Sequence, residues 1–183
     1  MSEALEQTPD VGALVEVLRR AGTVEEPNED IVGLTILHHG LQCATILARS
    51  DPDDPELHLA GLLHDVGHVL EPGRDEAHGR VGAAYVRPVL GDRVAALIEA
   101  HVPAKRYLVT VDASYRHQLS TGSVRTLTSQ GESMSVEEQD VFRAGPHADA
   151  AIRLRRADEA AKDPSANVPD LDAWLPTLLA VAG

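Results

Sequence analysis

The chain has 183 residues, and its 29 acidic and 16 basic side chains give a formal net charge of −13. A length of this order corresponds to one domain with a sizeable core, and the acidic balance argues against general nucleic-acid binding because phosphates would be repelled. The single cysteine, Cys43, excludes an intrachain disulfide framework and is typical of a reducing compartment.

Helix is favoured nearly everywhere, because alanine and leucine are abundant and runs of β-branched residues are scarce. The spacing of apolar residues predicts a first helix over Asp10–Ala21, and Glu25–Asn28 reads as a loop. A long helix is expected from about Glu29 to Arg49, ended by the proline-rich segment 51–55. The next helix is expected from Pro55 to about Leu70.

The second half of the chain continues the helical pattern. Asp75–Leu90 is expected to form a helix, and Gly91 is expected to begin a shorter one that runs to His101. Val102-Pro103 should break that helix, and the polar stretch Asp112–Ser135 predicts short helices and loops. The last predicted helices are Val136–Ala144, His147–Ala161 and Leu171–Ala182.

These elements predict one all-α domain over residues 1–183. Its core would span about residues 29–163, with the helices at 10–21 and 171–182 packed against it. Residues 1–10 are polar and acidic, unlike a signal peptide, and no apolar run reaches the roughly 18 residues that a membrane span needs. We therefore expect a cytoplasmic protein that binds neither a membrane nor nucleic acid.

The most informative segment is Leu62–His68, which reads Leu-Leu-His-Asp-Val-Gly-His. Burying both His64 and Asp65 without partners on an apolar helix would cost several kcal/mol, whereas a metal ion would satisfy both. Neighbours on a helix point about 100° apart, so these two side chains cannot share one proton, but Asp65 can bridge two ions. Further candidate ligands lie on other predicted helices, as in bundle metal sites: they are His39, His78, His101 and Asp158.

Neutral imidazoles and carboxylates suit iron, manganese or zinc, so this set of residues indicates a metal-dependent enzyme. Periodicity alone leaves both His38 and His39 open as the first ligand, because both occupy apolar positions. A single helical histidine is ordinarily structural or solvated. We assign three histidines to the surface: His58, His117 and His147.

The order of these residues resembles the HD-domain superfamily, most of whose members are phosphohydrolases. Within it, the chain is most similar to the mixed-valent di-iron oxygenases, above all the phosphonate-cleaving (PhnZ-type) oxygenases and more distantly myo-inositol oxygenase. The similarity covers about residues 34–163, and its most specific piece, His101–Leu108, places Lys105 four residues after a ligand histidine. Other matching pieces are Ala60–His68, Asp75–Gly79 and Leu154–Asp158.

The resemblance implies an HD-domain helical bundle with two iron ions, Fe(II) and Fe(III), in its core. The residues that would hold one ion are His39, His64, Asp65 and Asp158. The residues that would hold the other are the bridging Asp65, His78 and His101. Substrate would be contacted by His68 and Lys105 as catalytic residues, and a bound anion would be held by Arg155, Gln130 and Ser123.

The implied reaction uses dioxygen as co-substrate. Oxidation of the hydroxyl-bearing carbon of a small hydroxylated phosphonate leads to C–P cleavage and gives a carboxylate and phosphate. Lys105 as a point charge and Arg155 as a two-pronged donor suit such an anion.

One departure from the family concerns the substrate. The phosphonate-cleaving members carry a Tyr-x-x-Glu pattern ten and seven residues before the first ligand histidine, where this chain has Glu29 and Val32. Glu26 or Glu29 can replace that pattern only through another geometry. Because the pattern is absent, the substrate can be a different hydroxylated phosphonate or a related zwitterion without phosphorus.

Two other functions compete with the oxygenase. A metal-dependent HD phosphohydrolase acting on a phosphoester or nucleotide shares almost all the ligands, but Lys105 and the arginine three residues before Asp158 argue against it. A degenerate HD module used for sensing or protein interaction is disfavoured because all six ligand positions are intact. A requirement for dioxygen would separate the oxygenase from the phosphohydrolase.

Overall fold

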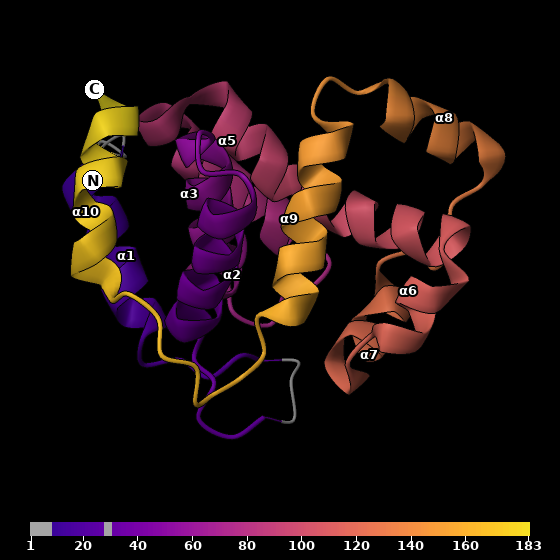
Figure 1. Ribbon diagram of the computed structural model, residues 1–183, viewed down its shortest axis with the longest axis horizontal. Helices are drawn as coiled ribbons and strands as arrows, with labels where there is room; N and C mark the ends of the chain where they lie inside the picture. The colour runs from indigo at the N-terminus through magenta and orange to yellow at the C-terminus, as the bar shows by residue number, and fades with distance from the viewer. Residues whose placement is uncertain (1–8, 28–30) are drawn as a thin grey trace, which may run out of the picture.

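The computed structural model describes residues 9–27 and 31–183. Within these ranges, every secondary-structure element longer than a single bridge is a helix (Figure 1). The prediction of an all-α fold is therefore confirmed. The helices are α1 (Val11–Ala21), α2 (Ile36–Ser50), α3 (Pro55–Leu63), α4 (Val66–Leu70), α5 (His78–Val111), α6 (Ala113–Gln118), α7 (Thr121–Ser129), α8 (Val136–Ala144), α9 (Ala148–Ala160) and α10 (Leu171–Ala182).

Helices α2, α3, α5 and α9 pack together in the middle of the bundle, and α1 and α10 lie together at one end (Figure 1). Apolar side chains from these six helices and from α4 form the main core. Helices α6, α7 and α8 lie at the opposite end, where Leu108, Tyr115 and Leu127 belong to a second, smaller cluster. The residues of the metal motif lie between the two ends.

Side-chain caps fix where several helices begin. The carboxylates of Asp10 and Asp54 accept hydrogen bonds from backbone N–H groups in the first turns of α1 and α3. Ser135 and Glu138 form a reciprocal capping box at the start of α8. Each cap satisfies N–H groups that have no partner within the helix, and the starts of α1, α3 and α8 agree with the sequence prediction.

Helix α2 begins later than its sequence suggests. The prediction placed its start near Glu29, which lies outside the described residues, but the helix begins at Ile36. Thr35 caps it, Gly33 has a left-handed φ of 86°, and an isolated antiparallel bridge joins Glu25 to Thr35. Within the described residues, 31–35 therefore lie outside the helix.

The predicted helix over 55–70 is wrong, because the chain breaks at His64-Asp65 into α3 and α4. Asp65 has φ −104° and ψ 8°, and it lies between the two helices. The backbone of Gly67 then packs so closely on α5 that a Cβ there would lie 2.0 Å from the carbonyl oxygen of His78. This break lets neighbouring side chains meet at one centre, which a continuous helix would not allow.

The predicted break at Val102-Pro103 is also wrong. Helix α5 is kinked at Gly91, where φ is 83°, and then runs through Pro103 to Val111. Proline removes one helical donor, but the carbonyl it would have paired belongs to Glu99, an exposed residue that water can reach. Continuity of α5 places His101 and Lys105 one turn apart on the same face.

His58 is a further correction, since we assigned it to the surface. It is only 6% exposed, because α10 covers it. Its ring lies 6.2 Å from that of Trp174, and its Nε2 lies 2.7 Å from the carbonyl oxygen of Asp51. The contact fixes the end of α2 to the start of α3.

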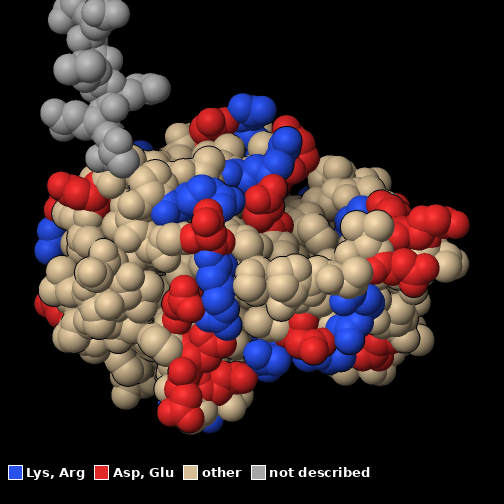
Figure 2. Space-filling view, turned by 90° about the horizontal axis from the view of Figure 1, so that it is seen from above, with Lys and Arg blue, Asp and Glu red and all other residues tan. Residues whose placement is uncertain are grey.

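Figure 2 shows acidic and basic side chains interspersed over one face of the molecule rather than gathered by sign. Ion pairs such as Arg143 with Asp149, at 2.6 Å, connect neighbouring helices. Exposed pairs of this kind contribute little to stability. Among the described residues, no helix is both long and apolar enough to cross a membrane.

Candidate metal centre

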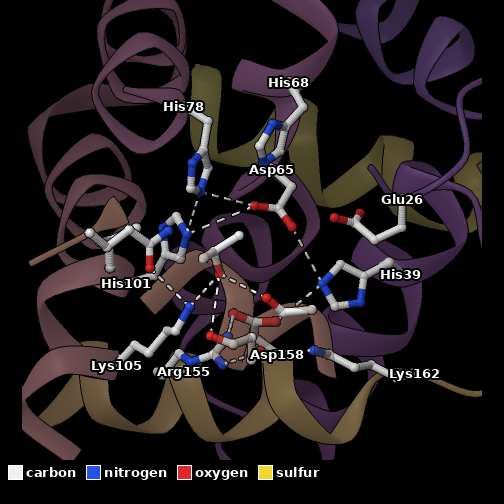
Figure 3. A pocket seen from close by; sticks show the side chains of 15 residues that line it. Glu26, His39, Asp65, His68, His78, His101, Lys105, Arg155, Asp158 and Lys162 are labelled. Atoms are coloured by element: carbon white, nitrogen blue, oxygen red, sulfur yellow. Dashed lines mark hydrogen bonds and ion pairs between the residues drawn. The ribbon is translucent and has the colours of Figure 1, made fainter. Parts of the chain in front are cut away.

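Side chains from α2, α9 and the break between α3 and α4 form the first half of the centre (Figure 3). The Nε2 atom of His39 lies 3.1 Å from Nε2 of His64 and 3.2 Å from Oδ1 of Asp158. Oδ2 of Asp65 lies 3.1 Å from Nε2 of His64 and 3.5 Å from Nε2 of His39. We call this group, His39, His64, Asp158 and Oδ2 of Asp65, the carboxylate side.

The other oxygen of Asp65 faces two histidines of α5. Oδ1 lies 3.4 Å from Nε2 of His78 and 3.8 Å from Nε2 of His101, and the two Nε2 atoms are 2.9 Å apart. We call this group the histidine side. Each oxygen of Asp65 therefore faces one group, which is the arrangement that the predicted bridge between two ions requires.

The four histidines share one hydrogen-bond arrangement. Each Nδ1 lies within hydrogen-bond distance of a backbone carbonyl oxygen, which accepts and so assigns the proton of a neutral ring to Nδ1. The pairs are His39 with Ala161 (2.9 Å), His64 with Gly61 (2.8 Å), His78 with Asp75 (2.5 Å) and His101 with Ile98 (2.6 Å). Every Nε2 then directs a lone pair into the centre.

This donor set fits metal ions. Two pairs of Nε2 lone pairs approach to 3.1 and 2.9 Å, and a cation between them removes their repulsion. Histidine nitrogen and carboxylate oxygen are ligands that iron, manganese and zinc accept. All six predicted ligands are buried, and the structure brings them together.

The pKa values show how the carboxylates dominate the first half of the centre. Burial alone would lower the pKa of His39, but its hydrogen bonds with Asp158 and Asp65 outweigh burial and raise it well above the ordinary value. On the histidine side, burial and the neighbouring His78 hold the pKa of His101 well below its ordinary value. The carboxylates beside His39 therefore attract positive charge. A divalent cation bound there would supply that charge in place of a proton on the imidazole.

A cationic region adjoins the centre within the same pocket, which has a volume of about 50 Å³. The Lys105 ammonium donates to Oγ1 of Thr126 at 2.6 Å and to Oε1 of Gln130 at 2.9 Å. Burial, followed by the charge of Arg155, lowers the pKa of Lys105 to about 7. Lys162 enters from the end of α9 and donates to the hydroxyl of Ser123 at 3.0 Å.

Arg155 lines the pocket, but its guanidinium is already engaged. Nε donates to the Tyr115 hydroxyl at 2.7 Å, and Nη2 donates to Oγ of Ser123 at 2.9 Å and to Glu159. Nη1 donates to Oδ2 of Asp158, whose Oδ1 faces the metal centre. Arg155 therefore orients a predicted metal ligand, as groups hydrogen-bonded to ligands commonly do.

His68 lies on the histidine side. Its ring stacks on that of His78, with centroids 4.2 Å apart and an angle of 14° between the planes. Burial lowers its pKa to about 4, so the ring is neutral at pH 7. Nδ1 is buried, makes no hydrogen bond within the described ranges and lies 3.5 Å from Oδ1 of Asp75.

Comparison with known proteins adds a family to this geometry. The HD domain family model matches residues 36–144. The chain belongs to the HD-domain family. It is 39% identical over 150 residues to hydroxymethylphosphonate dioxygenase of Gimesia maris, covering 77% of this chain and 74% of that protein. The family assignment confirms the resemblance inferred from the order of the histidines and aspartates.

Two further relatives of this HD domain cover most of its length. Over 179 residues it is 31% identical to [1-hydroxy-2-(trimethylamino)ethyl]phosphonate dioxygenase (glycine-betaine-forming) of Leisingera caerulea, covering 88% of this chain and 89% of that protein. Over 141 residues it is 33% identical to an uncharacterized protein of Acanthamoeba polyphaga mimivirus, covering 72% and 64% respectively.

The structure resolves the choice between His38 and His39. His39 points into the centre, whereas Nε2 of His38 lies 3.0 Å from the carbonyl oxygen of Ala166, outside it. The remaining predicted substrate contacts all line the same HD-domain pocket, namely His68, Lys105, Ser123, Gln130 and Arg155.

Five residues that line the pocket were not assigned a site role from the sequence: Glu26, Val102, Gly122, Thr126 and Lys162. Lys162 and Thr126 had a signal in their spacing, because each lies four residues from a predicted site residue, Asp158 and Gln130 respectively. Glu26 had none, since it lies in a loop without periodicity. Burial, followed by the charge of Asp65, raises the pKa of Glu26 to about 8. Of the two positions that replace the Tyr-x-x-Glu pattern, Val32 is 87% exposed and Glu29 lies outside the described residues.

Proposed function

We propose that this HD-domain protein is a dioxygen-dependent di-iron oxygenase that cleaves the C–P bond of a small hydroxylated phosphonate. The observation that carries the proposal is the cationic region around Lys105, one helical turn from the ligand His101. The relatives named phosphonate dioxygenases support it. The proposal includes a cytoplasmic location, because a chain with a single cysteine suits a reducing compartment.

The six ligands divide the metal centre unequally. The carboxylate side would hold one iron through His39, His64, Asp158 and the bridging Asp65. The histidine side would hold the other through His78, His101 and the same Asp65. Iron bound there would supply the redox capacity that dioxygen activation requires, and the side with more carboxylates favours the ion of higher charge.

The cationic region would bind the phosphonate group. The Lys105 and Lys162 ammonium groups and the Ser123 hydroxyl point into one part of the pocket. Charge-assisted hydrogen bonds to an anion are about twice as strong as neutral ones. Thr126 and Gln130 hold the Lys105 ammonium in place, so little side-chain freedom is lost on binding. A phosphonate bound there would have its carbon near the metal centre.

On the histidine side, His68 lines the pocket and would contact the substrate hydroxyl through a ring nitrogen. A neutral ring can either donate or accept a hydrogen bond at that atom. His68 would thus orient the carbon to be oxidised, while its stacking on His78 fixes the plane of the ring.

The first substrate to test is hydroxymethylphosphonate, because the pocket of about 50 Å³ favours a small molecule. Its oxidation by one O2 gives formate and phosphate, and this balances all atoms without a further reductant. The phosphonate named for the second relative carries an additional (trimethylamino)methyl group on the hydroxyl-bearing carbon, so this bulkier phosphonate is the natural comparison.

The experiment measures phosphate and formate released by iron-loaded protein in air and under argon. The proposal predicts equal amounts of both products, formed only with dioxygen. Phosphate release from phosphoesters under argon with Mn(II), and none from the phosphonate in air, would instead assign the protein to the HD phosphohydrolases.

A further inference from the structure

Glu26 is a buried acid that no role described so far uses. It lies in the loop between α1 and α2 and is 9% exposed. Its Oε2 is buried and has no hydrogen-bond partner in the part of the chain that the structure describes. A buried carboxylate without a partner is costly, so its retention here requires a reason.

The carboxylate of Glu26 is directed at the metal centre. One of its oxygens lies within 4.8 Å of a ring nitrogen of His39 and of an oxygen of Asp65, and Nε2 of His39 lies 3.5 Å from Oδ2 of Asp65. Figure 3 shows the Glu26 side chain turned toward both residues. The three donor atoms therefore face one small volume on the carboxylate side.

The backbone holds Glu26 in this position. The Glu26 N–H donates to the carbonyl oxygen of Leu34 at 2.8 Å, and the Ile36 N–H donates to the carbonyl oxygen of Val24 at 2.9 Å. Leu34 is fully buried. Since the loop is anchored on both sides of Glu26, its orientation does not depend on a freely rotating surface side chain.

The charges around Glu26 favour a cation as its partner. Asp65 and Asp158 already bring two carboxylates to this side, and each neighbouring imidazole offers a lone pair. Arg155 is engaged with Asp158 and Glu159, so it does not neutralise Glu26. A cation at the carboxylate side satisfies all of these groups together.

We propose that Glu26 is an additional ligand of the ion held on the carboxylate side. His39, His64, Asp65 and Asp158 offer that ion four donor atoms, and Glu26 offers a fifth. Glu26 would leave one position of an octahedral ion open there, against three on the histidine side. The inference rests on the proposed two-ion centre but not on the identity of the substrate.

The test compares Glu26→Gln with the matched control Glu25→Gln, which changes an exposed acid beside it. Fe(II) alone is titrated anaerobically into metal-free protein against a competing chelator. Wild type and the control should bind both ions with the same affinities. Glu26→Gln should bind the carboxylate-side ion at least tenfold more weakly and leave the other affinity unchanged.

Thermal unfolding gives an independent readout. Burial keeps metal-free Glu26 mainly in its neutral form near pH 7, and glutamine has nearly the same shape, so metal-free Glu26→Gln should unfold at about the same temperature as metal-free wild type, while iron should stabilise it less. Unchanged iron affinities would overturn the proposal, and a lower midpoint without metal would then assign Glu26 a structural role. Because neither substrate nor dioxygen is present, failure here is distinct from failure of the oxygenase proposal.

Discussion

The two sides of Asp65 offer their ions different environments. The carboxylate side combines two histidines with Asp158, whose second oxygen is held by Arg155, and with the nearby Glu26. The histidine side offers His78 and His101 and no carboxylate besides Asp65 among the described ligands. Asp65 thus lies between a group rich in carboxylates and a group with none besides Asp65 itself among the described ligand candidates.

This difference gives the two sides different roles in the proposed centre. A site with more negative charge stabilises the more highly charged ion, because charge interactions are strong where water is excluded. The histidine side has fewer donors and borders His68, so it has more open positions for exchangeable molecules. A mixed-valent pair would follow from this asymmetry of ligands.

The largest effect is expected from Asp65→Ala, because Asp65 faces both sides. This variant should lose both irons, whereas His101→Ala should lose only the histidine-side ion. Iron per chain, measured by elemental analysis after gel filtration, checks both. The control is Asp53→Ala, an exposed aspartate that should keep two ions. Two irons per chain in Asp65→Ala would refute the bridge.

Arg155→Lys should affect the carboxylate side and not the histidine side. Lysine keeps the positive charge but cannot make the same set of hydrogen bonds to Asp158, Ser123 and Tyr115. Loss of a group that orients a ligand costs roughly 10–100-fold in metal affinity, and the loss should fall on the carboxylate-side ion alone. Chelator competition measures it, with the exposed Arg153→Lys as control. An equal loss at both ions would contradict the assigned asymmetry.

Lys105→Ala should leave the metal centre intact and weaken substrate binding. A hydrogen bond to a charged group contributes about 1.5–3 kcal/mol, which corresponds to roughly 10–100-fold in Kd. Equilibrium binding of hydroxymethylphosphonate under argon, with iron per chain measured in parallel, checks this. Arg106→Ala is the control, because Arg106 is the next cation on α5 but pairs with Glu138 outside the pocket. An iron loss in Lys105→Ala would point to a role in the metal centre instead.

The smallest expected effect is a pH dependence of anion binding. Burial lowers the pKa of Lys105 to about 7, so its positive charge is present below that pH and is lost as pH rises through it. Phosphonate affinity should therefore fall severalfold between pH 7 and 8 in wild type. Lys105→Arg keeps its charge and should show a flatter profile. Parallel profiles in the two proteins would show that Lys105 does not titrate in this range.

The residues that the sequence offered as ligands converge in the structure, whereas the backbone around them was predicted less well. His39, His64-Asp65, His78, His101 and Asp158 come from separate elements and meet in one place, and their role as ligands stays a prediction. The break between α3 and α4 was missed because the apolar pattern continues through it. Pro103 was taken as a helix breaker, although an exposed carbonyl makes its cost tolerable.

Residues outside regular elements were the hardest to predict. Glu26 reaches the centre through a loop, where no period relates sequence position to direction. His58 is buried by α10, more than 100 residues further along the chain, and such packing leaves no local signal. Lys162 lies just after the end of α9 and lines the pocket, but the sequence analysis did not assign it a role.

The most direct test of the two-sided centre is electron paramagnetic resonance of protein reconstituted with Fe(II) under argon and then partly oxidised. The account predicts a signal from a spin-coupled Fe(II)/Fe(III) pair that shifts when hydroxymethylphosphonate is added and is absent in Asp65→Ala. Only isolated Fe(III) in the wild-type protein, with no change on adding the phosphonate, would contradict it.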